Sequence, residues 1–225
     1  SGIFAVGVVK MLFGGTGKNF VNPAAAGRVF LSIAFPAMML SGFLFPQIGS
    51  LSGVTPSTGA TPLGGAIKGE GELSLLDAFL GTGMSGAMGE TSKAAILLGY
   101  LYLSVRGVID WKYPLVAIVC CGLTSMPLAG TYKAFLPSIL TGGLIFGSVF
   151  MLTDYVTTPN TKLGNYIYFA LFGVVVALLR FKNESEVVSY VILLMNFVVP
   201  LIDRALRPKP FGSVKEKKVG EGKKV

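Results

Sequence analysis

Long apolar stretches constrain this chain more than any other feature of its sequence. Several approach the roughly 20 residues that an α-helix needs to cross the hydrocarbon core of a bilayer. Lipid offers no partner for free backbone N–H and C=O groups, so such stretches must be helical. Only 13% of the 225 residues are charged, against about a quarter in an average soluble domain. We therefore predict an all-α fold, a polytopic transmembrane helical bundle.

Six spans are expected after a first apolar run, Ile3–Phe13, which is too short to cross a membrane and lacks the features of a signal peptide. The expected spans are Ala24–Phe45, the shorter Thr91–Val105, Tyr113–Ala129, Leu136–Leu152, Tyr166–Leu179 and Val187–Ile202. The 30 glycines suit membrane helices that approach one another closely. The short first run and the absence of an initial Met lead us to expect the later part of a longer protein, or a chain trimmed at its N-terminus.

The formal net charge of +8 is concentrated near the C-terminus. Basic residues are retained on the cytoplasmic side of membranes, so we predict a multi-pass protein of the bacterial cytoplasmic (inner) membrane with a cytoplasmic C-terminus. Counting back through the spans places residues 46–90 outside, together with the Arg180–Lys182 turn. The predicted organisation is a transmembrane domain over residues 1–206, with 46–90 as an extracytoplasmic loop, and a basic tail over 207–225.

Composition excludes several kinds of site. The chain has no His, the commonest metal ligand and proton shuttle. Cys120 and Cys121 are adjacent in an apolar run and cannot complete a four-ligand metal site, so we interpret both as packing residues. The basic residues are not interleaved with aromatic residues, which argues against nucleic acid as a partner and for the lipid bilayer, where tail lysines meet water or anionic lipid.

Two polar, glycine-rich segments interrupt the apolar pattern. In the first, residues 14–23, Asn22 is expected to cap a helix that begins at Pro23. The second, Leu75–Glu90, is half apolar and broken by glycines, which favours a re-entrant or interrupted helix. Such backbone is tolerated at membrane depth only where protein shields it or where it lines a cavity, and broken helices often form binding sites in transport proteins.

The most informative loop is the small-residue segment around Thr61. Thr61 precedes Pro62 and is therefore pushed towards an extended backbone. Its preceding neighbours Ser57, Thr58, Gly59 and Ala60 are all small, so a modifying enzyme could reach the Thr61 hydroxyl. The alternative is that Thr61 caps a short helix beginning at Pro62.

Four segments together carry a resemblance to a known family. They are Ser57–Leu63 (STGATPL), Gly17–Ala24 (GKNFVNPA), Gly86–Ser92 (GAMGETS) and Phe150–Pro159 (FMLTDYVTTP). In order and spacing they resemble the family of membrane subunits that includes the D subunit of the Rnf ferredoxin:NAD oxidoreductase and the B subunit of the sodium-pumping NADH:quinone reductase. The resemblance implies FMN bound covalently to Thr61 through a phosphoester, attached by a dedicated flavin transferase. It also makes a second, noncovalent flavin, riboflavin, an expected cofactor.

The chain departs from the family pattern at two positions. Thr55 stands where the attachment motif often has an Asp, six residues before the modified Thr, and Tyr155 replaces the usual Pro after Asp154. The first departure bears on recognition by the transferase more than on the identity of Thr61.

Polar and charged residues in or near the membrane are the remaining candidates, because burying a charge in lipid is costly. Glu90 either favours the dipole of the helix that follows it or handles ions, and Asp154 belongs to a turn or to a flavin or ion site. Arg28 either snorkels, pairs with a partner subunit or neutralises a flavin. Lys18 and Asn19 bind a flavin group or form a polar loop at a helix start, and Asn22 is a further candidate for cofactor binding.

The expected function is electron relay through covalently bound FMN, coupled to Na⁺ or H⁺ translocation, in an Rnf-type complex. The protein supplies position and electrostatics to such a cofactor. The chain has no complete active site of its own, so the expected partners are other membrane and peripheral subunits, including a second flavin subunit and iron–sulfur subunits. The alternatives are a B-type subunit of a sodium-pumping NADH:quinone reductase, a channel or secondary transporter without flavin, and a purely structural scaffold.

Overall fold

The computed structural model describes residues 1–37, 75–81, 89–183 and 187–207. Within these ranges the regular structure is helical, with no strand. The longer elements are η1 (Phe4–Met11), α1 (Pro23–Ala34), α5 (Lys93–Val105), α6 (Lys112–Ala129), α9 (Lys162–Asn183) and α10 (Val188–Ala205). The shorter ones are α4 (Leu75–Leu80), η2 (Tyr132–Ala134), α7 (Phe135–Leu140), α8 (Leu144–Phe146) and η3 (Gly147–Met151). The predicted all-α bundle is confirmed.

Among the described residues, the helices long and apolar enough to cross a membrane are α6, α9 and α10. They confirm three predicted spans, Tyr113–Ala129, Tyr166–Leu179 and Val187–Ile202. The helices α1 and α5 are apolar but shorter. The predicted span from Ala24 extends to Phe45, and its part beyond residue 37 lies outside the described residues.

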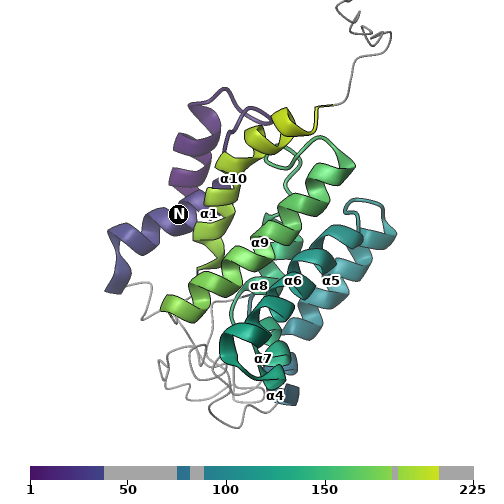
Figure 1. The fold of residues 1–225 in the computed structure, drawn as a ribbon. Coiled ribbons are helices and arrows are strands. Elements are labelled where there is room, and N and C mark those ends of the chain that lie inside the picture. Colours follow the sequence, from purple (N-terminus) through teal and green to yellow (C-terminus); the bar gives the residue numbers. More distant parts are fainter. Residues whose placement is uncertain (38–74, 82–88, 184–186, 208–225) are drawn as a thin grey trace, which may run out of the picture.

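Close packing of α6 against α9 forms the centre of the bundle (Figure 1). A Cβ atom at Gly173 of α9 would lie 2.3 Å from the carbonyl oxygen of Ala117 on α6, so only glycine permits this approach. On the same helix, Tyr168, Phe169 and Phe172 are fully buried and join residues of α10 in the main hydrophobic cluster.

The segment predicted as the span Leu136–Leu152 passes the test for a span only when its two halves are taken together, and it is a bent pair of helical segments rather than one straight helix. The chain bends by 66° between the η2–α7 segment and the α8–η3 segment. Gly142 has a φ of +64°, which an L side chain rarely adopts. The break is stable because other parts of the chain supply donors to its carbonyl groups, a compensation that the apolar pattern of this segment does not reveal.

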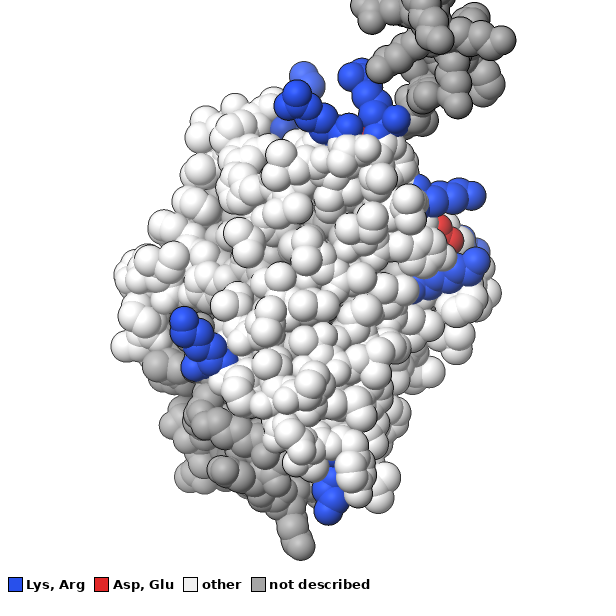
Figure 2. Space-filling view, in the orientation of Figure 1, with Lys and Arg blue, Asp and Glu red and all other residues white. Residues whose placement is uncertain are grey.

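The end of α10, which leads to the tail predicted to be cytoplasmic, lies at the same end of the bundle as two of the loops. Figure 1 shows the η1–α1 loop, the loop that precedes α9 and the end of α10 at the top of the view, with α7 at the opposite end. Figure 2 shows a largely uncharged middle, with Lys and Arg at that top end and along the right edge, and others at the left and at the lower end. This distribution fits a body inserted in lipid.

Candidate functional site

The break between α7 and α8 is the first part of the candidate site. The last carbonyl groups of an α-helix have no partner within the helix, and Thr141 adopts an extended backbone directly after α7. Its hydroxyl donates to the carbonyl of Pro137 over 2.6 Å. The other carbonyls at this point need donors from elsewhere, because Ser138 and Thr141 are buried.

Two buried cations supply those donors. Arg180 of α9, only 1% exposed, donates from Nη1 to the carbonyls of Ser138 at 3.1 Å and Thr141 at 3.4 Å. Lys93, the first residue of α5, is 4% exposed and donates from Nζ to the carbonyl of Gly142 at 2.8 Å and to that of Glu90. Positive charge is favoured at the C-terminal end of a helix, so these cations stabilise the break.

A buried carboxylate completes the cluster. Glu90 is 5% exposed and forms an ion pair with Arg28 of α1. A Cβ atom at residue 143 would lie 2.9 Å from the Glu90 Cδ and Oε1 atoms, so the carboxylate occupies space that exists only because residue 143 is glycine. We call Arg28, Glu90, Lys93 and Arg180, with the break at residues 141–143, the charged cluster.

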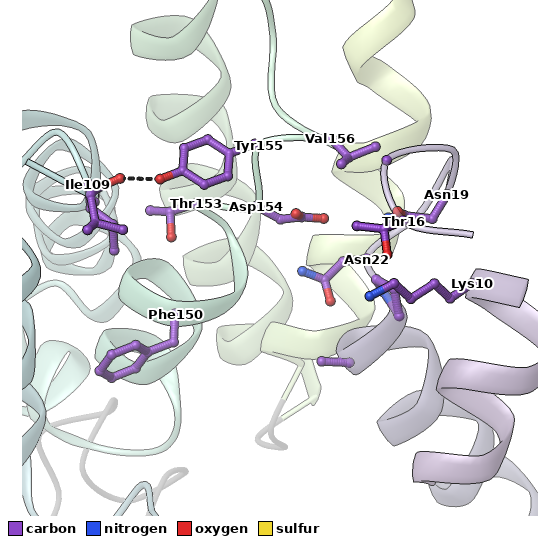
Figure 3. Close-up of a pocket in the computed structure, with 14 residues that line it drawn as sticks. Lys10, Thr16, Asn19, Asn22, Ile109, Phe150, Thr153, Asp154, Tyr155 and Val156 are labelled. Atoms are coloured by element: carbon purple, nitrogen blue, oxygen red, sulfur yellow. Dashed lines mark hydrogen bonds between the residues drawn. The ribbon is translucent and has the colours of Figure 1, made fainter. Parts of the chain in front are cut away.

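A cavity of about 430 Å³ is the second part of the candidate site. In Figure 3, Lys10 of η1 and Thr16, Asn19 and Asn22 of the η1–α1 loop lie on one side. The other side is formed by residues 150–156, which carry Phe150 and Asp154. Two of the four sequence motifs therefore meet across one cavity, although more than 120 residues separate them in the chain.

The two walls of the cavity are tied together by Asn22. Its side-chain oxygen accepts a hydrogen bond from the N–H of Ala25 at 3.0 Å, which confirms the predicted helix cap. Its Nδ2 donates to the carbonyl of Met151 at 2.7 Å. One residue thus starts α1 and holds it against the end of η3.

Asp154 occupies a turn and also faces the cavity. Its Oδ2 accepts from the Thr157 hydroxyl at 3.2 Å, and its backbone carbonyl accepts from the Thr157 N–H. Tyr155, at the position of the usual proline, donates through its hydroxyl to the carbonyl of Val108 at 2.6 Å. This bond ties the 152–157 turn to the loop before α6, so the departure from the family pattern has a structural role.

The other sequence candidates fall into three groups. Asn19 lines the cavity and is buried, with its Nδ2 donating to the carbonyl of Val21. Lys18 is exposed, and its side chain lies across Gly14 rather than among the lining residues of the cavity. The candidate segment around the predicted attachment residue lies outside the described residues; it comprises Ser57, Thr58, Gly59, Ala60 and Thr61.

Three interpretations of charged residues need correction. Glu90 does not cap α5, which begins at Lys93 with Ser92 as its cap, the Ser92 side chain accepting from the N–H of Ala95. Arg28 does not need a partner subunit for its charge, because it pairs with Glu90 within this chain. Arg180 does not belong to an exposed turn, because α9 continues to Asn183 and buries it.

Sequence reasoning missed Lys93 and Arg180 as members of the site. A usable signal was present, since both basic residues adjoin or interrupt apolar segments, where an ionisable residue is expected to have a partner. The prediction of topology from the positions of Arg and Lys treats each of these residues as solvated. Under that assumption neither Lys93 nor Arg180 stands out as a buried residue.

Comparison with known proteins finds relatives over nearly the whole chain. The model of the NQR2, RnfD, RnfE family matches residues 1–212. The chain is 37% identical over 225 residues to the D subunit of the Na(+)-translocating ferredoxin:NAD(+) oxidoreductase complex of Acetobacterium woodii, covering 96% of this chain and 66% of that protein. It is 38% identical to the D subunit of the proton-translocating ferredoxin:NAD(+) oxidoreductase complex of Clostridium ljungdahlii, covering 93% of this chain and 66% of that protein.

A component of a quinone reductase is similarly related. Over 214 residues the chain is 39% identical to the B subunit of the Na(+)-translocating NADH-quinone reductase of Pseudomonas aeruginosa, covering 89% of this chain and 52% of that protein. The chain thus spans between about half and two thirds of the length of these relatives. The extent of the match over residues 1–212 shows that the chain belongs to the NQR2, RnfD, RnfE family.

Proposed function

We propose that this chain is a flavin-carrying membrane subunit of an ion-translocating electron-transport complex of the Rnf ferredoxin:NAD oxidoreductase type. The observation that carries the proposal is the family match over residues 1–212, because the relatives compared above are subunits of ion-translocating oxidoreductases by name. This match favours a redox complex over a channel or transporter without flavin. The other subunits of the complex would include a second flavin subunit and the subunits that hold the iron–sulfur centres.

Within the proposal, Thr61 carries FMN through a phosphoester. The support is the STGATPL sequence at residues 57–63, since the segment itself lies outside the described residues. FMN accepts electrons singly or in pairs, and a covalent tether fixes its distance to neighbouring redox centres. The extracytoplasmic position that the charge distribution predicts for the loop agrees with attachment by an exported transferase.

The cavity between the η1–α1 loop and residues 150–156 is the proposed place for a noncovalent flavin. Its volume of about 430 Å³ falls within the range of small-molecule sites. Its walls combine apolar surface from Phe150, Val108 and Ile109 with the Lys10 ammonium and the Asp154 carboxylate on opposite sides. Such a lining suits a planar ring whose edge carries both donors and acceptors, so the residues present fit riboflavin.

The two charged candidates have separate places in the proposal. Glu90 would belong to the ion pathway, because it is a buried carboxylate beside a broken helix. Asp154 would act at the cavity, either on the flavin or on an ion that neutralises it. The coupling ion stays open, since relatives of nearly equal identity are named for Na⁺ in one case and for protons in the other.

The alternative is a B-type subunit of a sodium-pumping NADH:quinone reductase, which the 39% identity to such a protein favours. The two hypotheses differ in the reaction of the assembled complex. Purified complex that reduces NAD with reduced ferredoxin supports the Rnf hypothesis. Complex that oxidises NADH with a quinone, and is inactive with ferredoxin, supports the alternative.

In-gel fluorescence tests the covalent flavin. The subunit from mature complex is separated on a denaturing gel and viewed under ultraviolet light, with Thr61→Ala and Thr58→Ala compared. We expect fluorescence in the wild type and in Thr58→Ala, which keeps the attachment hydroxyl in the same loop, and none in Thr61→Ala. Fluorescence that persists in Thr61→Ala removes Thr61 as the attachment residue.

Flavin extraction tests the cavity. Denaturation releases noncovalent flavin, which chromatography then quantifies for the matched pair Thr16→Trp and Lys18→Trp. Both residues are exposed in the same loop, but only Thr16 lines the cavity. We expect Thr16→Trp to lose the released riboflavin and Lys18→Trp to retain it. Equal release from both variants contradicts this placement.

A further inference from the structure

The break between α7 and α8 has the chemistry of a site for a small cation. Carbonyl oxygens from unwound backbone, and from the C-terminal ends of half-helices, coordinate Na⁺ in broken membrane helices. Here the carbonyls of Ser138, in the last turn of α7, and of Thr141 and Gly142, directly after it, accept hydrogen bonds from side chains of other helices. The Glu90 carboxylate lies against Gly143 at the same break. Dipole and carboxylate both favour positive charge at this point.

Positive charge is present at this break, carried by side chains of the chain itself. Lys93 Nζ binds two carbonyls, those of Glu90 and Gly142, and Arg180 binds those of Ser138 and Thr141. Arg28 binds the Glu90 carboxylate. The carbonyls that would surround a metal cation in a broken helix are therefore already engaged by an ammonium and a guanidinium group.

Lys93 and Arg180 differ in whether a metal ion could take the place of their charged group. A guanidinium is planar and always charged, and Arg180 is fixed between two carbonyls of consecutive turns. An ammonium is a compact point charge on a flexible stem, can lose its proton when buried, and matches a monovalent metal ion in charge. Because this stem has four carbons, Nζ can leave the break while the Lys93 backbone stays at the start of α5.

We propose that the break is a monovalent-cation site formed by the carbonyls of Glu90 and Gly142 and the Glu90 carboxylate, and that the Lys93 ammonium occupies it as a tethered cation. A Na⁺ ion fills the site when the ammonium is absent. The proposal deepens the proposed function, because it names the place where a translocated cation exchanges with a charge of the protein. Its role in translocation rests on that function, whereas the cation site itself does not.

Glycine at two consecutive positions fits this assignment. Gly142, at φ +64°, turns the chain so that its carbonyl reaches Lys93. Gly143 leaves the space that the Glu90 carboxylate fills. Either glycine alone could serve a simple bend, but together they bring a carbonyl and a carboxylate to the same point.

The test measures thermal unfolding of the purified, intact complex in NaCl and in choline chloride of equal ionic strength. Lys93→Met keeps the length of the side chain and removes the ammonium, and Lys112→Met removes an exposed charge at the start of α6 as the matched control. We expect sodium to raise the Tm of Lys93→Met by about 3 °C for each tenfold increase above the dissociation constant. Wild type and Lys112→Met should show no difference between the two salts.

Further variants keep the proposal falsifiable. Adding Glu90→Gln to Lys93→Met should abolish the sodium effect, and Lys93→Arg should assemble without any dependence on sodium. Assembly of Lys93→Met only when cells are grown and complex is purified in sodium also supports the proposal. A Lys93→Met complex that responds equally to both salts, or that assembles in neither, overturns it.

Flavin content separates this proposal from the proposed function. In-gel fluorescence is measured on the same wild-type and variant samples. If sodium raises the Tm of Lys93→Met but no sample carries flavin, the cation site is supported and the electron-relay function is refuted. If the chain is fluorescent but sodium does not change the Tm of Lys93→Met, the function is supported and the cation site is refuted.

Discussion

Replacing Arg180 by Met should destabilise the bundle more than almost any other substitution of a basic residue. Met keeps much of the length and apolar contact of the Arg stem but removes the guanidinium. The carbonyls of Ser138 and Thr141 would then lose the donor that Arg180 Nη1 supplies at 3.1 and 3.4 Å. The loss falls on the break itself, where α7 ends without a helical continuation.

The magnitude follows from the burial of those carbonyls. A buried acceptor left without its donor costs about 1–3 kcal/mol. The 3.4 Å contact is the weaker of the two, so we expect a total of about 2–4 kcal/mol. Water cannot easily replace the donor, since Arg180 is 1% exposed and Thr141 is fully buried. For a chain of this size, that corresponds to a fall in Tm of about 4–16 °C.

The assay is thermal unfolding of purified complex in detergent, with Lys182→Met as the matched control. Lys182 lies two residues further along α9 and is exposed, so its loss should change Tm by no more than about 1–2 °C. An Arg180→Lys variant should recover only part of the stability, because a compact ammonium replaces the planar guanidinium whose Nη1 donates to both carbonyls. Equal Tm values for Arg180→Met and Lys182→Met would refute the idea that Arg180 sustains the break.

Three further substitutions test other parts of the structure by the same measurement of Tm. Gly143→Ala places a methyl group 2.9 Å from the Glu90 carboxylate and should cost about 1–3 kcal/mol, whereas Gly7→Ala, with open space around it, should cost less than about 1 kcal/mol. Gly173→Ala inserts a methyl group 2.3 Å from the Ala117 carbonyl oxygen and should separate α6 from α9, seen as loss of assembled complex; normal assembly would contradict the packing. Asn22→Ala removes the cap of α1 and the bond to Met151, and should lower stability by about 1–3 kcal/mol, while Asn22→Asp, which keeps the cap, should lose less.

The sequence predicts the helices well where one physical rule dominates. The requirement for about 20 apolar residues identifies α6, α9 and α10, because nothing inside those spans competes with lipid burial. The cap at Asn22 and the start at Pro23 are likewise local, and the structure confirms both.

The site was harder to predict because its parts depend on distant partners. The break at residues 141–143 is hidden in an apolar run, and the donors that stabilise it come from Lys93 and Arg180, about 40–50 residues away on either side. Glu90 is equally compatible, in the sequence, with a helix-start charge and an ion ligand, and its pairing with Arg28, 62 residues away, is visible only in the structure. The cavity required two motifs to meet in space, which no one-dimensional pattern encodes.

The central claim is that the Thr61 hydroxyl anchors a flavin phosphate, and mass spectrometry of the peptide that contains this residue tests it most directly. In mature complex, we expect this peptide to be heavier by FMN less one water, with fragmentation assigning the addition to Thr61 rather than Thr58. An unmodified peptide from active complex, or the same mass on another residue, would contradict the claim.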